Sequence, residues 1–190
     1  MKLFFDTEFT GLHQNTTLIS IGIVALDGRY FYAEFNDYDK TQVNDWIQEN
    51  VIENLLYNEK ETHCIEESLV PYNKVNDDYT PLWICMKNDT TNIINKLKEW
   101  LLQFVDGIQM WSDCLSYDWV LFNQLFGGAQ NVLPNINYIP MDICTSFYDK
   151  GIDPDISRED FIDNVVEGKK HNSLYDAKVI RECYLKLYHV

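Results

Sequence analysis

The chain has 190 residues, of which 46% are hydrophobic and 14% aromatic, and this composition excludes a disordered or low-complexity protein. Thirty acidic residues against fifteen basic ones give a formal charge of −15, which disfavours a broad electrostatic surface for nucleic acid or for an anionic membrane. No apolar run approaches the roughly 18 residues of a membrane span.

The first part of the chain predicts three strands. Residues 2–6 form a short apolar run, residues 17–26 are long and rich in β-branched side chains, and residues 29–35 are aromatic. Asp27 and Gly28 separate the second run from the third, and this dipeptide is typical of a tight β-hairpin. At least two of the three strands are therefore expected to be antiparallel.

The middle of the chain is less regular. Residues 40–57 have apolar side chains near helical spacing, whereas residues 59–87 have no sustained period and contain two prolines. We predict a single domain over 1–190 with an irregular surface excursion at about 37–88. Within this excursion, residues 59–87 are where we expect a partner to bind, including a second copy of the chain in a homodimer.

The second half alternates helices with short strands. Apolar side chains at helical spacing predict helices over 89–105, about 116–126 and about 173–188. Short apolar runs predict strands over 108–111 and 136–142. A hairpin followed by alternating strands and helices indicates an α/β sheet of mixed direction.

Cysteine usage and the N-terminal residues bear on the compartment. The five cysteines are scattered and contain no C-x-x-C pair, so neither a zinc site nor a disulfide framework is expected. Acidic residues follow the first few apolar ones, too early for a signal peptide. We therefore expect a cytoplasmic protein with reduced thiols.

Acidic residues mark three places in this pattern, the first being the end of the first strand. Asp6 and Glu8 lie two residues apart, so their side chains project from the same face. Adjacent carboxylates repel one another unless a cation lies between them, and such oxygen ligands suit Mg²⁺ or Mn²⁺. The alternative is an acidic strand end before the turn at Thr10 and Gly11.

The second place is the start of the helix at 116–126. Asp118 lies in its first turns, where an acidic residue also offsets the helix dipole. Asp113 follows the preceding strand in the position of an N-cap, and Asp142, which ends the strand at 136–142 and precedes a helical stretch, is likewise interpreted as an N-cap. None of these acids is diagnostic of a site by itself.

The third place is the start of the last helix. His171 precedes this helix, and Asp176 lies five residues later, near its first turn. Ser173 and Asp176 also have the spacing of a capping box, which is the structural alternative for Asp176. The alternatives for His171 and its neighbour Lys170 are a loop histidine without a role and an ordinary surface lysine.

Three segments in chain order carry a resemblance to a known family. They are DTEFTGL at 6–12, SYDWVLF at 116–122 and HNSLYDA at 171–177. Together they resemble the three motifs of the DEDDh branch of the 3′→5′ exonucleases, whose fold is ribonuclease H-like. The chain length and the opening strands are most similar to the bacterial and phage exoribonucleases typified by a mycobacterial polyadenylate-specific enzyme.

This resemblance implies a fold and a reaction. The fold would be a mixed five-stranded α/β sheet, flanked by helices, whose first three strands form an antiparallel meander. The reaction would be metal-dependent hydrolysis of single-stranded RNA 3′ ends to nucleoside 5′-monophosphates. Two Mg²⁺ or Mn²⁺ ions would stabilise the attacking and leaving oxygens of the phosphodiester.

The resemblance also implies roles for single residues. Asp6 would bridge both ions, and Glu8 and Asp176 would bind the ion on the side of the nucleophile. Asp118 would hold the second ion, and His171 would be the general base for the attacking water. Leu12 has the position of an apolar residue that wedges against terminal bases in relatives. The candidate substrate contacts are Thr7, Phe9, Gly11, Leu12 and Lys170.

Two other functions fit the same motifs. A 3′→5′ DNA exonuclease would use the same chemistry, and the ribose 2′-hydroxyl that separates the two substrates is often contacted by backbone. A catalytically inactive nucleic-acid-binding module would keep the fold and lose the reaction. The presence of all four carboxylates together with His171 argues against the inactive module.

Overall fold

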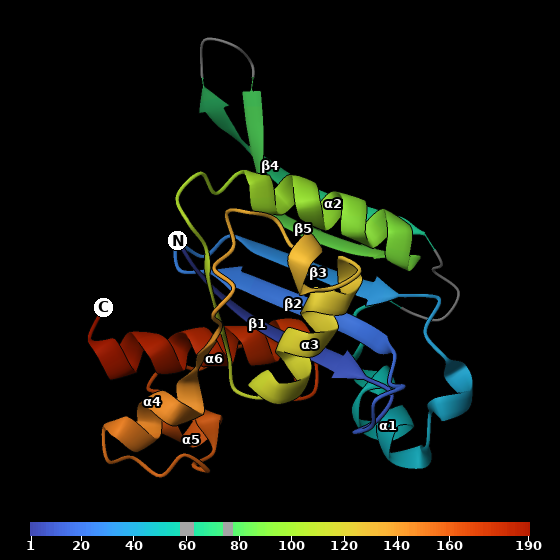
Figure 1. Ribbon diagram of the computed structural model, residues 1–190. Coiled ribbons are helices and arrows are strands. Elements are labelled where there is room, and N and C mark those ends of the chain that lie inside the picture. The colour runs from blue at the N-terminus through green and yellow to red at the C-terminus, as the bar shows by residue number, and fades with distance from the viewer. Residues whose placement is uncertain (58–62, 74–77) are drawn as a thin grey trace.

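A computed structural model describes residues 1–57, 63–73 and 78–190 and contains one mixed sheet (Figure 1). The sheet has seven strands in the order β4-β5-β3-β2-β1-β6-β7. The expected α/β class with a mixed sheet is confirmed, whereas the expected count of five strands is wrong. The two additional strands, β4 and β5, come from the segment whose sequence showed no period.

The first three strands form the predicted antiparallel meander. β1 (Lys2–Phe9) pairs with β2 (Leu18–Ala25), and β2 pairs with β3 (Tyr30–Phe35). The predicted hairpin turn joins β2 to β3, and Gly28 in this turn has a φ of 93°. A residue without a Cβ atom adopts such a φ without steric conflict, which is why the Asp-Gly pair predicted the turn.

The predicted excursion contains a regular hairpin. β4 (Cys64–Asn73) and β5 (Asp78–Asn88) are antiparallel, and β5 pairs in parallel with β3. Figure 1 shows these two strands extending beyond helix α2 (Thr90–Leu102), which covers them. The irregular interpretation of 59–87 is therefore wrong for the described residues; within this range, residues 59–62 and 74–77 lie outside them. Pro71 argued against a strand, but β4 is at the edge of the sheet, where a missing N–H donor is tolerated.

Short helices replace the single helix predicted over residues 40–57. They are η1 (Lys40–Gln42), α1 (Asp45–Asn50) and η2 (Ile52–Asn54). Val43, Ile47, Val51 and Leu55 pack with Ile19 of β2 in a small cluster, whereas Trp46 is 55% exposed. Helical spacing therefore indicated burial correctly except at Trp46, and it did not show where the helix breaks.

The remaining elements follow the predicted alternation. Helices α2, α3 and α6 confirm the three predicted helices, whereas the strand expected over 136–142 is reduced to β7 and an isolated bridge at Ile136. Asp142 caps α4 as predicted, and α5 was not predicted. None of the described helices combines the length and apolarity needed to cross a membrane. The elements are α2 (Thr90–Leu102), β6 (Gln109–Ser112), α3 (Leu115–Leu125), η3 (Ala129–Asn131), β7 (Met141–Asp142), α4 (Ile143–Asp149), α5 (Arg158–Phe161) and α6 (Ser173–Tyr188).

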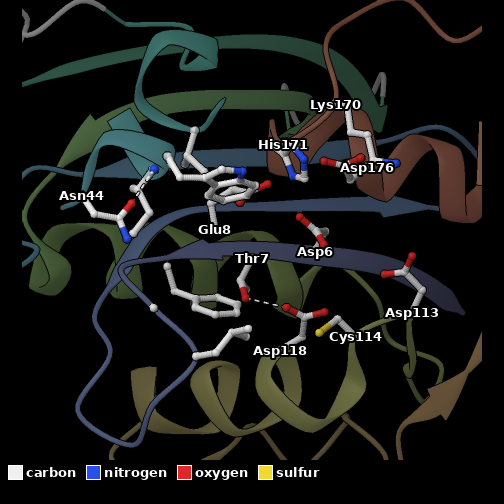
Figure 2. Close-up of a pocket in the computed structure, with 16 residues that line it drawn as sticks. Asp6, Thr7, Glu8, Asn44, Asp113, Cys114, Asp118, Lys170, His171 and Asp176 are labelled. Atoms are coloured by element: carbon white, nitrogen blue, oxygen red, sulfur yellow. Dashed lines mark hydrogen bonds between the residues drawn. The ribbon is translucent and has the colours of Figure 1, made fainter. Parts of the chain in front are cut away.

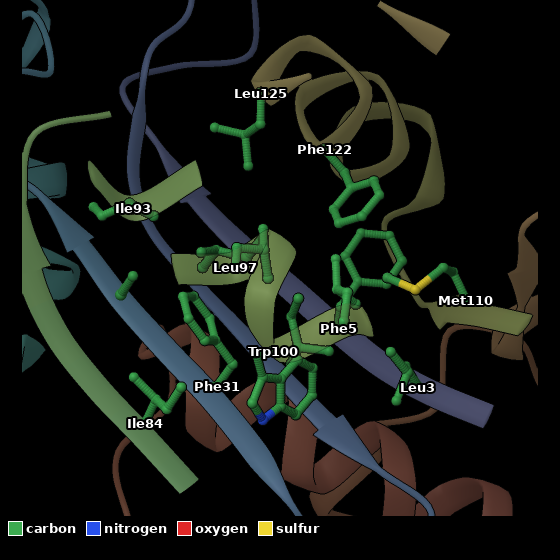
Figure 3. Close-up of a cluster of buried hydrophobic side chains, with 14 of the residues drawn as sticks. Leu3, Phe5, Phe31, Ile84, Ile93, Leu97, Trp100, Met110, Phe122 and Leu125 are labelled. Atoms are coloured by element: carbon green, nitrogen blue, oxygen red, sulfur yellow. The ribbon is translucent and has the colours of Figure 1, made fainter. Parts of the chain in front are cut away.

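Alternation along β1 determines which side chains face which helices. Leu3 and Phe5 pack against Trp100 of α2 and Phe122 of α3 on one face of the sheet (Figure 3). Phe4 packs on the opposite face, in a cluster with α4 and α6. Successive strand residues point to opposite faces. Asp6 and Glu8, which follow Phe4 in the even-numbered positions of β1, are therefore directed to the α6 face, and Thr7 is directed to the α3 face.

The start of α6 packs directly on the backbone of β2. A Cβ atom at Gly22 would lie 2.2 Å from the carbonyl oxygen of Ser173 and 2.4 Å from the amide nitrogen of Leu174. Both neighbours are backbone atoms, so no side chain can rotate away to make room. Only glycine at this position allows the helix to begin so close to the sheet.

We expect Gly22→Ala to lower the free energy of unfolding by at least about 2 kcal/mol, because the added methyl group overpacks a contact between two backbones. Urea denaturation measures this loss. Gly107→Ala is the matched control, since the nearest atom to its methyl group outside the adjoining residues would be the carbonyl oxygen of Asn135 at 3.9 Å, and it should change stability by less than about 0.5 kcal/mol. Equal denaturation midpoints for the two variants would contradict this packing.

Candidate active site

The predicted site residues converge on one cavity. The cavity has a volume of about 470 Å³ and opens where β1 ends and where α3 and α6 begin (Figure 2). Its walls include all five predicted catalytic residues, namely Asp6, Glu8, Asp118, His171 and Asp176. They also include all five candidate substrate contacts, namely Thr7, Phe9, Gly11, Leu12 and Lys170.

The carboxylates form two groups of three that share one member. Oxygens of Asp6, Glu8 and Asp176 lie within 4.8 Å of one another, and so do oxygens of Asp6, Asp113 and Asp118. Figure 2 shows Asp6 in the middle of the five carboxylates. A side chain common to two potential cation sites has the position that a bridging ligand requires.

One buried oxygen of Asp6 has no hydrogen-bond partner in the part of the chain that the structure describes. This atom is Oδ2, and the residue is 9% exposed. Burial of a carboxylate oxygen without a partner is unfavourable, so such atoms are found where a ligand or an ion completes the site. The donor set consists of oxygens alone, which Mg²⁺ and Mn²⁺ prefer.

The pKa values of the clustered carboxyl groups are raised. Burial is the largest cause for each group, and repulsion from neighbouring carboxylates adds to it. The pKa rises to about 8 for Glu8 and to about 7 for Asp118 and Asp176, and it lies well above the ordinary range for Asp6. Without a cation the cluster therefore retains protons at neutral pH, and a divalent cation would displace them.

Two hydroxyl groups fix Asp118 in place. The Thr7 hydroxyl donates to Oδ1 of Asp118 at 2.6 Å, and the Ser112 hydroxyl donates to Oδ2. Asp118 is completely buried. Thr7 reaches α3 because odd-numbered residues of β1 point to that face. Its hydroxyl therefore serves the carboxylate, and its contact with a substrate stays a prediction.

Asp113 belongs to the carboxylate cluster, and its interpretation as an N-cap is wrong. Cys114 occupies the N-cap position of α3 and makes no capping bond through its side chain. The Asp113 carboxylate instead lines the cavity and forms an ion pair with Arg158 of α5 at 3.2 Å. Sequence reasoning missed this residue because its partner comes from a helix that was not predicted.

The start of α6 presents Asp176 to the cavity. Asn172 is the N-cap, with its side-chain oxygen accepting from the amides of Leu174 and Tyr175. The capping box that was the structural alternative for Asp176 is therefore not the cap of α6. Because Asn172 satisfies the helix end, the Asp176 carboxylate is available to the other acids.

His171 lies beside the acids in an unusual backbone conformation. Its φ is 63°, in the left-handed region that residues with a Cβ atom rarely adopt. The ring of Trp46 meets the imidazole edge-on, with centroids 5.2 Å apart. Burial and the nearby charge of Lys170 lower the pKa of His171, so the imidazole is neutral at neutral pH and able to accept a proton.

The remaining candidate contacts form the rim of the cavity. Phe9 stacks on Tyr117 with ring centroids 5.3 Å apart, and Leu12 is 73% exposed. The ammonium group of Lys170 lies 3.6 Å from Glu159. Sequence reasoning did not assign Trp46, which lines the same cavity. Substrate contact by any of these side chains stays a prediction.

The chain is similar to known proteins over most of its length, beyond the three motifs. The sequence model of the Rv2179c-like 3′-5′ exoribonuclease domain matches residues 1–187. The chain is 27% identical over 152 residues to 3′-5′ exoribonuclease Rv2179c and to 3′-5′ exoribonuclease MT2234.1, from two strains of Mycobacterium tuberculosis. Each alignment covers 80% of this chain and 76% of the relative. The chain therefore belongs to the Rv2179c-like 3′-5′ exoribonuclease domain family, as its resemblance to the bacterial exoribonucleases implied.

Proposed function

We propose that this protein is a metal-dependent 3′→5′ exoribonuclease with a ribonuclease H-like fold, which releases nucleoside 5′-monophosphates from single-stranded RNA. Membership of the family supports the reaction class. The observation that carries the mechanism is the pair of carboxylate groups sharing Asp6 in the cavity that also holds His171. A binding module without chemistry would not need this arrangement.

Bound Mg²⁺ or Mn²⁺ ions would supply charge neutralisation at the scissile phosphate and at the attacking and leaving oxygens. Asp6 would be a ligand of both ions. Glu8 and Asp176 would complete the site on the side of the nucleophile, and Asp118 would serve the other ion. The unpartnered oxygen of Asp6 and the all-oxygen donor set support this assignment.

His171 would accept the proton of the attacking water on its imidazole ring. Its lowered pKa keeps the ring unprotonated at neutral pH. Its position beside Asp176 at the cavity wall supports a role on the side of the nucleophile. The imidazole of His171 would then release this proton to solvent before the next catalytic cycle.

The shape of the cavity supports a strand end as the substrate. Its volume of about 470 Å³ is that of a small-ligand pocket, which suits the terminal nucleotides of a single strand. Apolar and aromatic side chains form its rim, including Leu12 and Trp46, and such groups bind bases by stacking. Recognition of only a few nucleotides does not require a broad basic surface, and it is therefore compatible with a formal charge of −15.

Parallel digestion of matched RNA and DNA oligonucleotides with Mn²⁺ tests this proposal. We expect stepwise shortening of the RNA from its 3′ end, with nucleoside 5′-monophosphates as the products and slower degradation of the DNA. Equal or faster hydrolysis of DNA would instead support the DNA exonuclease. Intact oligonucleotides of both kinds would support the inactive binding module.

Stability of the metal-free protein should fall as pH rises from about 4 to about 8. The clustered carboxyl groups have raised pKa values in the folded state, so the folded state holds more protons than the unfolded state in this window, and each increase in pH favours unfolding. Mn²⁺ should remove this penalty and raise the melting temperature more at pH 8 than at pH 6, because it competes with fewer protons.

Thermal melts at both pH values, with and without Mn²⁺, measure these effects. Mn²⁺ at 100 times its dissociation constant should add about 2.7 kcal/mol to the free energy of unfolding. The Asp6→Asn variant is the control and should lose most of the shift. A wild-type protein with no Mn²⁺ shift at either pH would contradict the metal site.

Replacement of Asp113 should lower kcat less than replacement of Asp118. Asp118→Asn removes a proposed ligand, whereas Asp113→Asn removes a carboxylate whose charge Arg158 already balances. We therefore expect Asp113→Asn to lower kcat by about 10–100-fold, the usual effect of losing a group next to a metal ligand, and Asp118→Asn to lower it further. Comparison of the two rates under saturating Mn²⁺ decides between them. A larger loss at Asp113 would show that it is the ligand.

A further inference from the structure

The loop that carries His171 is bound on both sides to a distant segment of the chain. The Asn54 side chain donates from Nδ2 to the carbonyl oxygen of Lys170 at 3.0 Å. In return, the Asn172 side chain donates from Nδ2 to the carbonyl oxygen of Asn54 at 2.9 Å. The two residues that flank His171 are thus tied to one residue of η2, more than 100 positions earlier in the chain.

Buried polar groups hold that segment against the sheet. Glu34 of β3 is completely buried, and its Oε1 atom accepts from the amides of Leu56 and Tyr57 at 2.7 and 3.1 Å. The Tyr32 hydroxyl donates to the same oxygen at 2.8 Å and also accepts from Asn172 Nδ2 at 3.3 Å. The chain just after Asn54 is therefore fixed to the same strand that supports Asn172.

The conformation of His171 needs such support. A residue with a Cβ atom at a φ of 63° is strained by about 1–2 kcal/mol, and strained residues persist where the surrounding structure determines them. Trp46, from the helix that precedes Asn54, packs against the imidazole ring. The segment from α1 to η2 thus contacts both the ring of His171 and the backbone on either side of it.

We propose that Asn54 is a positioning residue for His171, and that its side-chain amide fixes the imidazole relative to Asp176 and the attacking water. This inference rests on the proposed function. Asn54 does not line the catalytic cavity and is bonded to the histidine loop, so it would act through that loop and not by contacting substrate. Its loss should affect the chemical step and leave substrate and metal binding intact.

Asn54→Ala tests the proposal. We expect kcat to fall by about 10–100-fold, since displacement of a catalytic group by about 1 Å costs up to about 10² in rate. KM and Mn²⁺ affinity should stay within about twofold of the wild-type values. Asn54→Asp keeps the shape of the side chain, removes the donor, and should give the same loss. Asn50→Ala is the matched control, because among the described residues the Asn50 side chain donates to the carbonyl of Trp46 alone, and its kcat should be unchanged.

A double-mutant cycle with His171→Ala separates positioning from a general structural role. If Asn54 acts through the histidine, Asn54→Ala should lower kcat no further in the His171→Ala background. An equal further loss in that background, or a wild-type kcat in both Asn54 variants, would overturn the inference while the proposed function stands. Absence of RNA hydrolysis by the wild-type protein would overturn the proposed function and the inference with it.

Discussion

Replacement of Asp6 by Asn should abolish RNA hydrolysis and weaken Mn²⁺ binding in the same variant. Asp6 is the only residue shared by the two carboxylate groups found among the described residues, and an amide neither bridges two cations nor neutralises their charge. We expect kcat to fall by roughly 10³-fold or more, since the metal-assisted step loses both ions together. The fold should survive, because Asn has nearly the same shape and removes a buried carboxylate that repels its neighbours.

Calorimetric titration with Mn²⁺ and a single-turnover assay on the same preparation measure both effects. Asp149→Asn is the matched control, since Asp149 is exposed at the end of α4 and does not line the cavity. That variant should keep wild-type Mn²⁺ affinity and activity. Wild-type Mn²⁺ affinity in Asp6→Asn would refute the bridging role, whatever its activity.

Replacement of His171 by Ala should separate chemistry from metal binding. Its proposed task is removal of a proton, so kcat should fall by roughly 10²–10⁴-fold, the usual contribution of a positioned general base. Mn²⁺ affinity should stay near wild type because the four proposed carboxylate ligands remain. The wild-type rate should rise with pH as the imidazole loses its proton, at a pH below the ordinary imidazole range because its pKa is lowered. The variant should lose this rise.

Three measurements on His171→Ala distinguish the roles a histidine at this position can have. A general base predicts a large loss of kcat alone. A metal ligand predicts lost Mn²⁺ affinity, and a purely structural residue predicts a lower melting temperature with turnover retained. A loss of turnover below about tenfold would exclude His171 as the base.

Local sequence patterns predicted those parts of the site that depend on the period of a strand or helix. Asp6 and Glu8 were expected on one face of the first strand, and both line the cavity. Asp118 and Asp176 were expected in the first turns of their helices, and α3 and α6 begin close to the predicted positions. In each case neighbouring residues in the chain determine the direction of the side chain.

Features that depend on distant partners were not predictable in the same way. The ion pair between Asp113 and Arg158 joins residues of two elements, and the first of them had the sequence position of an N-cap. Asn172 caps α6 in place of Ser173, which lies against Gly22 of β2 and whose hydroxyl bonds to a serine of the same strand. The tie between Asn54 and the histidine loop likewise has no local pattern.

In the sheet, too, local sequence patterns predicted one part and missed another. The meander of β1, β2 and β3 was predicted because its turn has a characteristic dipeptide and its strands are β-branched and aromatic. The hairpin of β4 and β5 was missed because β5 is buried on both faces over Ile84, Cys85 and Met86, so its sequence does not alternate. Its pairing with β3 is parallel and so has no connecting turn to reveal it.

The most direct test of the account uses 5′-labelled single-stranded RNA with either a free or a blocked 3′ end, incubated with wild-type protein in the presence of Mn²⁺ or EDTA. The account predicts a ladder of products shortened one nucleotide at a time, only with a free 3′ end and only with Mn²⁺, and nucleoside 5′-monophosphates as the released species. Cleavage of the blocked RNA, or equal cleavage in EDTA, would contradict a metal-dependent 3′→5′ exoribonuclease.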